Sequence, residues 1–159
     1  MEKIYRPGAI GALMDEYERV ALELKNLLST ISQEEFIKVC DTATKDEDCR
    51  SIQTIMKHVV RAGYGYLDQV CIFLGKPVSV HNYHIYNVFH SIDELEKMIA
   101  ATSETVADNL KMTEEKILAT RMETRWGLYD IEMMFEHAIV HILRHRRQIE
   151  KFLASQKII

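Results

Sequence analysis

The feature that most constrains the fold is an uninterrupted amphipathic stretch at residues 129–154, YDIEMMFEHAIVHILRHRRQIEKFLA. It contains neither Gly nor Pro, so nothing in it breaks a helix of about seven turns. On a helical wheel, five apolar side chains share one face: Ile131, Met134, Ala138, Ile149 and Phe152. The sequence therefore predicts a long helix that buries this face against other elements.

Three histidines, His137, His141 and His145, follow one another at four-residue intervals on this helix. Residues four apart are neighbours on one side of a helix. At roughly 100° per residue, His145 falls within the buried face, His141 borders it and His137 lies further toward solvent. A buried imidazole without a partner costs roughly 1–3 kcal/mol. A metal ion shared by His141 and His145 would satisfy both rings, and so would separate hydrogen bonds to side chains or water. The spacing leaves both interpretations open.

Three further long helices are predicted from apolar residues at three- and four-residue intervals, over residues 7–28, 49–74 and 91–110. Only two prolines and six glycines occur in 159 residues, which favours long elements. Strand signals are few. We therefore expect an all-α fold, a four-helix bundle forming one domain over residues 1–159.

The segments between the long helices carry weaker signals. Two capping-box sequences, Ser32–Glu35 and Ser91–Glu94, predict a short helix over residues 32–39 and the start of the helix at residues 91–110. Residues 113–123 are expected to hold another helical turn or two. The connections after the first and second long helices exceed the usual length in bundles, which favours crossover connections.

The connection at residues 76–90 holds three more histidines, His81, His84 and His90, among Tyr and Phe residues. No Cys or third nearby ligand completes a zinc pattern with His81 and His84. We expect this aromatic segment to form the wall of a pocket rather than to bind metal.

Composition excludes several classes of function. The net charge of −4 provides no general attraction to nucleic acid. No apolar stretch has the length of a membrane span. The first residues, MEKIYRPG, lack the apolar run of a signal peptide. The three cysteines, an odd number without a CxxC pair, do not form a disulfide framework. We therefore expect a cytoplasmic protein that binds neither nucleic acid nor membrane.

The last helix and one earlier histidine resemble the DinB/YfiT-like family of helical bundle proteins. The run His137-x3-His141-x3-His145-Arg146-Arg147-Gln148 is similar to the H-x3-H-x3-H-R-x-Q run of that family's fourth helix. The segment SIQTIMKHV, which ends at His58 and Val59, is similar to the context of a single histidine on its second helix. The resemblance covers most of the chain. Arg147 departs from it, because family members often have Gly there.

The resemblance implies a three-histidine metal site made by His58, His141 and His145, with His137 outside it. Periodicity alone places His58 roughly 100° from the centre of its helix's buried face, which favours an exposed side chain. Three neutral imidazoles suit Zn²⁺ or Ni²⁺ and leave coordination positions open. The resemblance also implies a homodimer.

The implied activity is that of a metal-dependent enzyme acting on a small molecule. The metal would activate either water, as in a hydrolase, or a low-molecular-weight thiol, as in an S-transferase. Glu132 and Glu136 lie opposite the buried face and are poor candidates for a general base, which weakens the hydrolase interpretation slightly. The alternative is a non-catalytic binding or stress-response protein with a vestigial or structural histidine cluster.

Overall fold

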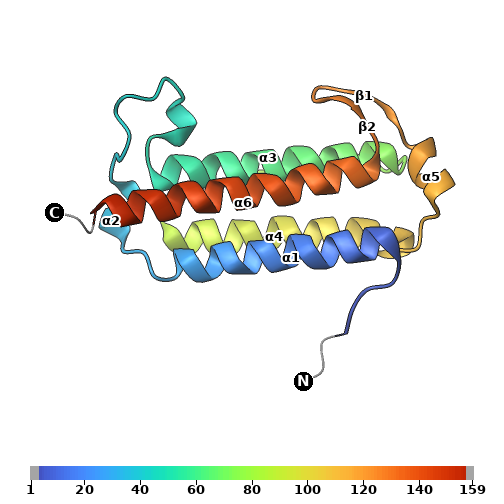
Figure 1. Ribbon diagram of the computed structural model, residues 1–159, viewed down its shortest axis with the longest axis horizontal. Helices are drawn as coiled ribbons and strands as arrows, with labels where there is room; N and C mark the ends of the chain where they lie inside the picture. The colour runs from blue at the N-terminus through green and yellow to red at the C-terminus, as the bar shows by residue number, and fades with distance from the viewer. Residues whose placement is uncertain (1–3, 157–159) are drawn as a thin grey trace.

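The computed structural model describes residues 4–156, which fold mostly into helix (Figure 1). The long helices are α1 Gly8–Leu28, α3 Ile52–Phe73, α4 Val88–Val106 and α6 Ile131–Gln156. The short ones are α2 Gln33–Ile37, α5 Glu114–Ala119 and the 3-10 turns η1 Glu47–Cys49 and η2 Ala107–Asn109. Strands β1 Met122–Thr124 and β2 Gly127–Tyr129 pair as an antiparallel hairpin. The prediction of a helical fold is confirmed, and the hairpin is an addition to it.

The four long helices enclose one hydrophobic core, with α1 and α3 each contacting both α4 and α6. The predicted buried face of α6 is confirmed, since Ile131, Met134, Ala138 and Ile149 are buried and only Phe152 is partly exposed. The ring of Tyr17 meets that of Phe135 edge-on, with 6.3 Å between centroids. Its hydroxyl donates a hydrogen bond to Met98 Sδ at 3.4 Å.

The direction of the helices explains the two long connections (Figure 1). Helices α3 and α4 run in the same direction, so residues 74–87 return along the length of the molecule between them. This connection is a crossover, as its length predicts. The other long connection joins α1 to the oppositely directed α3 and contains α2 and η1, so it is not a crossover. Within the described residues, no helix combines the length and the apolar character needed to cross a membrane.

Local capping decides where the helices begin. The predicted capping box of α2 is present, with the Glu35 amide donating to Ser32 Oγ and the Ser32 amide to Glu35 Oε2. Helix α3 begins after Ser51, which forms a second box with Thr54, rather than at Cys49.

The predicted start of α4 at Ser91 is wrong. The helix begins one turn earlier, where Asn87 Oδ1 accepts a hydrogen bond from the His90 amide at 2.8 Å. Asn is at least as good a cap as Ser, and the earlier start also buries Val88. Ser91 is then a buried helical residue whose hydroxyl donates to the Asn87 carbonyl. The helix ends at Val106, before the predicted residue 110.

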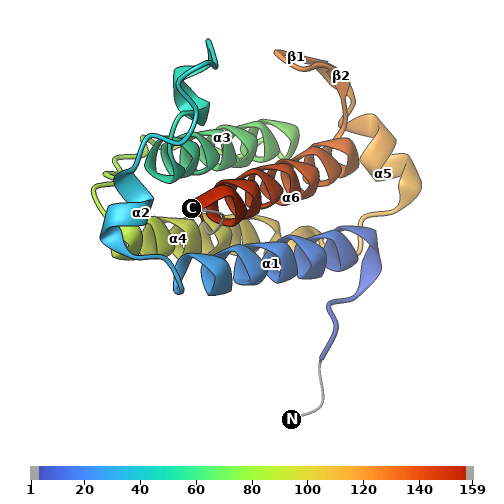
Figure 2. The ribbon, with the colours of Figure 1, turned by 60° about the vertical axis from the view of Figure 1, so that its left-hand side comes forward.

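The β1–β2 hairpin turns at Arg125 and Trp126, between the paired residues Thr124 and Gly127. Thr124 Oγ1 accepts a hydrogen bond from the Trp126 amide at 3.1 Å and donates one to the Gly127 carbonyl at 2.8 Å. Gly127 has a φ of 109°, in the region that favours glycine. The hairpin and residues 38–51 both project beyond α3 and α6, away from α1 (Figure 2). Asp48 of one segment contacts the histidine cluster described below, and Trp126 of the other approaches it through Tyr66.

Candidate metal centre

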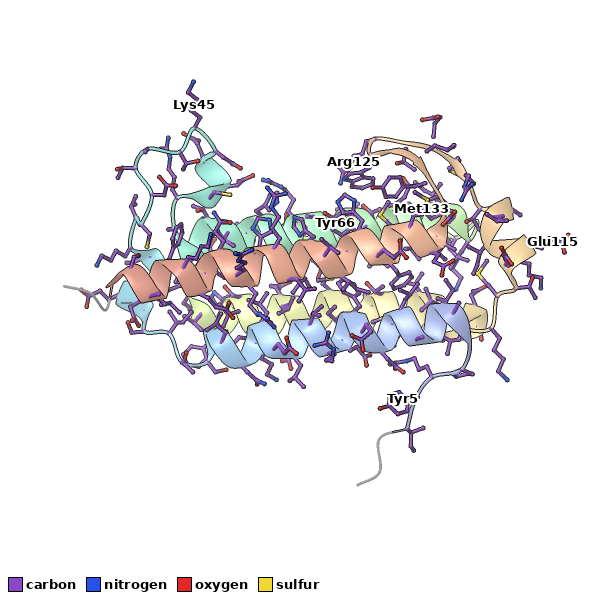
Figure 3. The ribbon with its side chains drawn as sticks, viewed as in Figure 1. Tyr5, Lys45, Tyr66, Glu115, Arg125 and Met133 are labelled. Carbon is purple, nitrogen blue, oxygen red and sulfur yellow. The ribbon has the colours of Figure 1, made fainter. Side chains whose placement is uncertain are left out.

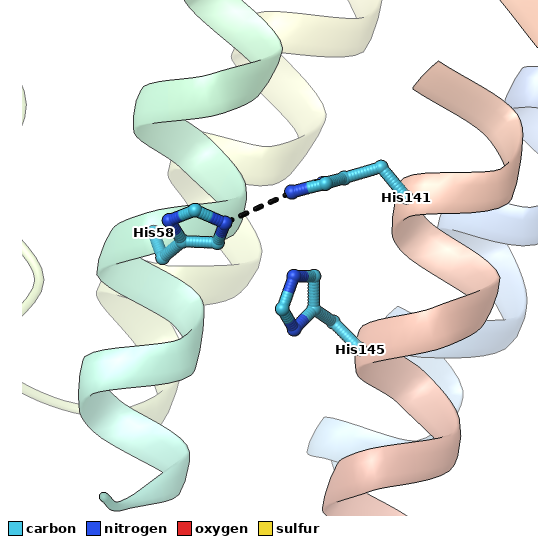
Figure 4. Close-up of side chains that lie close together, drawn as sticks. All are labelled: His58, His141 and His145. Atoms are coloured by element: carbon cyan, nitrogen blue, oxygen red, sulfur yellow. Dashed lines mark hydrogen bonds between the residues drawn. The ribbon is translucent and has the colours of Figure 1, made fainter. Parts of the chain in front are cut away.

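The contact between α3 and α6 brings together the three histidines that the sequence singled out (Figure 4). His58 projects from α3 toward His141 and His145 on α6. One ring nitrogen from each histidine lies within 4.8 Å of the other two, and the Nε2 atoms of His58 and His141 are 3.0 Å apart. In the part of the chain that the structure describes, this is the one group of three or more His, Cys, Asp or Glu side chains close enough to share a metal ion.

The helical wheel predicted the burial of the two histidines on α6 correctly, but not that of His58 on α3. His145 is 4% exposed and His141 is partly buried, as expected. The interpretation of His58 as an exposed residue is wrong, because its side chain retains only 28% of its accessible surface. Its edge position faces the neighbouring helix α6 rather than solvent. The position of a residue on a helical wheel does not show which neighbouring helix packs against that position.

The outer nitrogen of His145 has a partner. Its Nδ1 lies 3.1 Å from Oε1 of Gln148, one turn further along α6. An amide oxygen only accepts hydrogen bonds, so Nδ1 carries the proton. In the neutral ring, Nε2 is then a lone-pair donor suited to a metal. Gln148 thus makes its hydrogen bond to a histidine of the cluster.

The outer nitrogen of His58 faces an ion pair. Nδ1 lies 3.3 Å from Asp48 Oδ2 and 3.2 Å from Arg61 Nη2, and Arg61 and Asp48 are themselves paired. A guanidinium only donates, so the hydrogen bond from Arg61 makes Nδ1 an acceptor and puts the proton of the neutral His58 ring on Nε2, facing His141. If a metal replaced that proton, the ring proton would move to Nδ1, and Asp48 is the carboxylate placed to accept it and to orient the ligand.

Burial keeps His141 and His145 neutral at physiological pH. Burial, followed by the effects of positive charge on His145 and His58, lowers the pKa of His141 to about 3. Burial also lowers the pKa of His145, followed by the effect of His58, while the hydrogen bond to Gln148 raises it. Only the neutral imidazole can donate electrons to a metal. These rings are therefore in the form that a metal requires.

Two hollows each have a histidine of the cluster in their walls. A cleft of about 540 Å³ has His58 in its wall, together with residues of α3, the segment 79–83 and the hairpin turn. A groove of about 360 Å³ runs along α6 and includes His137, His141 and Glu136. A small molecule therefore has two routes to the histidines.

His137 lies outside the cluster, as the sequence and the family resemblance both indicate. Its Nδ1 is 3.0 Å from the Tyr129 hydroxyl, and its ring packs 5.2 Å from that of Tyr66. Burial lowers its pKa. The Tyr66 ring in turn lies 5.5 Å from that of His141. No pattern in the sequence had identified Tyr66 or Asp48 as neighbours of the site.

The histidines of the connection 76–90 do not join the cluster. His81 hydrogen-bonds Asp68 Oδ1 at 2.7 Å through Nε2 and stacks on Tyr64 at 4.2 Å. Like Tyr83, it lines the cleft beside His58, so the pocket-wall interpretation is correct for both residues. His84 and His90 are exposed and contact the ring of Tyr86.

No protein-family model and no curated protein matches this sequence. The resemblance to the DinB/YfiT-like family therefore rests on the motifs around His58 and His137–Gln148 alone. What the structure adds is independent of that resemblance: His58 meets a histidine pair that lies 83 or more residues away in the sequence.

The metal-free protein should lose stability as the pH falls below about 6.5. The pKa of His141 is about 3 in the folded protein and near 6.5 in an unfolded chain. Between these values the unfolded chain binds a proton that the folded protein does not, so acid favours unfolding. We expect the free energy of unfolding to fall by up to about 1 kcal/mol per pH unit in urea titrations between pH 6.5 and 4.5. His141→Asn should show a shallower dependence, and equal slopes in the two proteins would contradict this account.

Proposed function

We propose that His58, His141 and His145 bind one divalent metal ion, zinc or nickel, in a helical bundle of the DinB/YfiT type. The observation that carries the proposal is the convergence of three ring nitrogens within 4.8 Å of one another. Around a tetrahedral zinc ion, nitrogens at about 2.0–2.1 Å from the metal stand roughly 3.3 Å apart. The 3.0 Å between the Nε2 atoms of His58 and His141 is close to that separation.

The choice of metal follows from the ligands. Three imidazoles and no carboxylate or thiolate form the group, a set that suits zinc and nickel better than magnesium or calcium. Three protein ligands leave a position for water or substrate, as in catalytic rather than structural zinc sites. The cleft and the groove give such a molecule access.

We further propose that the protein is an enzyme acting on a small molecule, as an S-transferase for a low-molecular-weight thiol or as a hydrolase. A bound ion would supply Lewis acidity, which lowers the pKa of a coordinated thiol or water. Asp48, the carboxylate that contacts the cluster, faces Nδ1 of His58 and is paired with Arg61. It orients a ligand and is not free to act as a base. This favours the thiol reaction, which needs no separate base.

The remaining expectations belong to the same proposal. By resemblance to the family we propose a homodimer, and from composition a cytoplasmic location. A non-catalytic binding or stress-response protein is the alternative, and it predicts that the histidines bind no metal stoichiometrically.

Protein purified without chelator should contain about one zinc or nickel ion per chain, as measured by elemental analysis. His145→Ala should abolish this metal, because it removes the most buried of the three ligands. His137→Ala is the matched control. It removes a histidine one turn from His141 but outside the cluster, so it should retain the metal.

Circular dichroism should show that both variants remain helical. Full metal content in His145→Ala would rule out the three-histidine site. A wild-type protein that takes up neither Zn²⁺ nor Ni²⁺ when these are added would support the non-catalytic alternative.

Gln148 should affect metal affinity without contacting the metal. Gln148→Ala removes the acceptor that fixes the His145 ring, and loss of such a partner typically weakens binding by about 10–100-fold. Gln148→Glu keeps an acceptor at Nδ1 and should retain most of the affinity. Competition with a zinc chelator measures both variants. Equal affinity in Gln148→Ala and wild type would mean that the hydrogen bond plays no part in the site.

A further inference from the structure

The cleft beside His58 has the size and lining of a binding site for a small organic molecule. Its volume of about 540 Å³ lies within the range of such sites. Five of its side chains carry flat rings besides that of His58: Tyr64, Tyr66, His81, Tyr83 and Trp126. Aromatic walls bind flat or apolar groups, so the polar residues must determine which molecule is accepted.

Three charged side chains line this cleft: Arg61, Asp68 and Arg125. Arg61 is paired with Asp48. Asp68 accepts a hydrogen bond from His81. Arg125 is different, because no acidic side chain of residues 4–156 lies within 4.0 Å of its guanidinium. Its positive charge is therefore the one in the cleft that no ion pair neutralises.

The position of Arg125 is fixed by its neighbours. Its guanidinium lies over the ring of Trp126, 4.0 Å from the centroid. Trp126 packs 5.3 Å from Tyr66, whose ring in turn contacts His141. An unbroken series of rings thus connects the hairpin turn to the metal centre. Figure 3 shows Arg125 at the hairpin, on the side of the molecule away from α1.

Gly65 provides the space for this arrangement. A Cβ at that position would lie 2.3 Å from Nη2 of Arg125, so a larger residue would displace the guanidinium from α3. Stacking on Trp126 occupies the face of the guanidinium and leaves its N–H edge for an acceptor. A planar edge of this kind matches two oxygens of a carboxylate or a phosphate.

We propose that Arg125 is an oxyanion-binding residue of the cleft, which takes a small molecule carrying a carboxylate or phosphate group on an aromatic or apolar body. The reacting end of this molecule would meet the metal at His58, His141 and His145. This last step rests on the proposed function. The anion site itself does not need the metal, since Arg125 and Trp126 belong to the hairpin.

The test is a titration of the metal-loaded protein with three related probes: benzoate, phenyl phosphate and the neutral benzyl alcohol. Trp126 is the one tryptophan of the chain, so its fluorescence reports binding beside Arg125, and calorimetry provides a second readout. We expect one or both anions to bind and benzyl alcohol to bind at least tenfold more weakly. Which anion binds more tightly distinguishes a carboxylate from a phosphate substrate.

Arg125→Gln should weaken binding of the preferred anion by tenfold or more, and Arg125→Lys should weaken it less. The matched control is Arg147→Gln, the same loss of charge at an exposed position of α6 outside the cleft. It should leave the affinity unchanged. Arg125 lies on an exposed turn, and circular dichroism checks that its variants stay folded.

His145→Ala separates this inference from the metal proposal. If the anion still binds in that metal-free variant and binding still depends on Arg125, the oxyanion site stands whatever the metal proposal's outcome. If binding is lost in His145→Ala but unchanged in Arg125→Gln, the anion binds to the metal and the assignment to Arg125 is overturned. Equal binding of benzyl alcohol, or no binding of either anion, overturns it as well.

Discussion

The site depends on one contact, the packing of α3 against α6, because that contact places three imidazoles in a largely apolar interface. Two of the outer nitrogens have partners: Gln148 holds His145, and Asp48 faces His58. The proton on Nδ1 of His145 leaves its Nε2 as an acceptor, while one hydrogen bond joins Nε2 of His58 to Nε2 of His141. A cation with open coordination positions would satisfy all three rings at once, which that single hydrogen bond cannot do. The polar geometry of the interface therefore favours a metal more than the number of histidines alone.

The hairpin and the segment 38–51 complete this arrangement, although neither contributes a metal ligand. The segment supplies Asp48 at the outer edge of His58, and the hairpin supplies Trp126, which packs on Tyr66 next to His141. Both stand on the same side of the molecule (Figure 2). The helices thus position the three histidines, while the irregular segments supply the side chains around them. This division is common where a rigid scaffold carries variable loops.

Periodicity predicted the long helices and the inward direction of His141 and His145, because a helix repeats every 3.6 residues and its buried face is visible in the sequence. It failed for His58, whose role depends on which helix lies at its edge. The prediction that α4 begins at Ser91 was wrong because the sequence offers two N-cap residues, and the helix uses the earlier one, Asn87. Strands of three residues are too short to show alternation, so the hairpin was missed. Asp48 and Arg125 lie between the long helices, where residue spacing has no regular period. Their positions beside the site could therefore not be predicted from the sequence.

X-ray absorption spectroscopy of the metal-loaded protein tests the central claim most directly, because it identifies the atoms bound to the ion. The account predicts three imidazole nitrogens at about 2.0–2.1 Å from zinc, with the remaining coordination filled by light atoms from solvent. Addition of a low-molecular-weight thiol should introduce a sulfur at about 2.3 Å if the thiol reaction is correct. Fewer than three imidazoles, or a sulfur ligand before any thiol is added, would contradict a centre made by His58, His141 and His145.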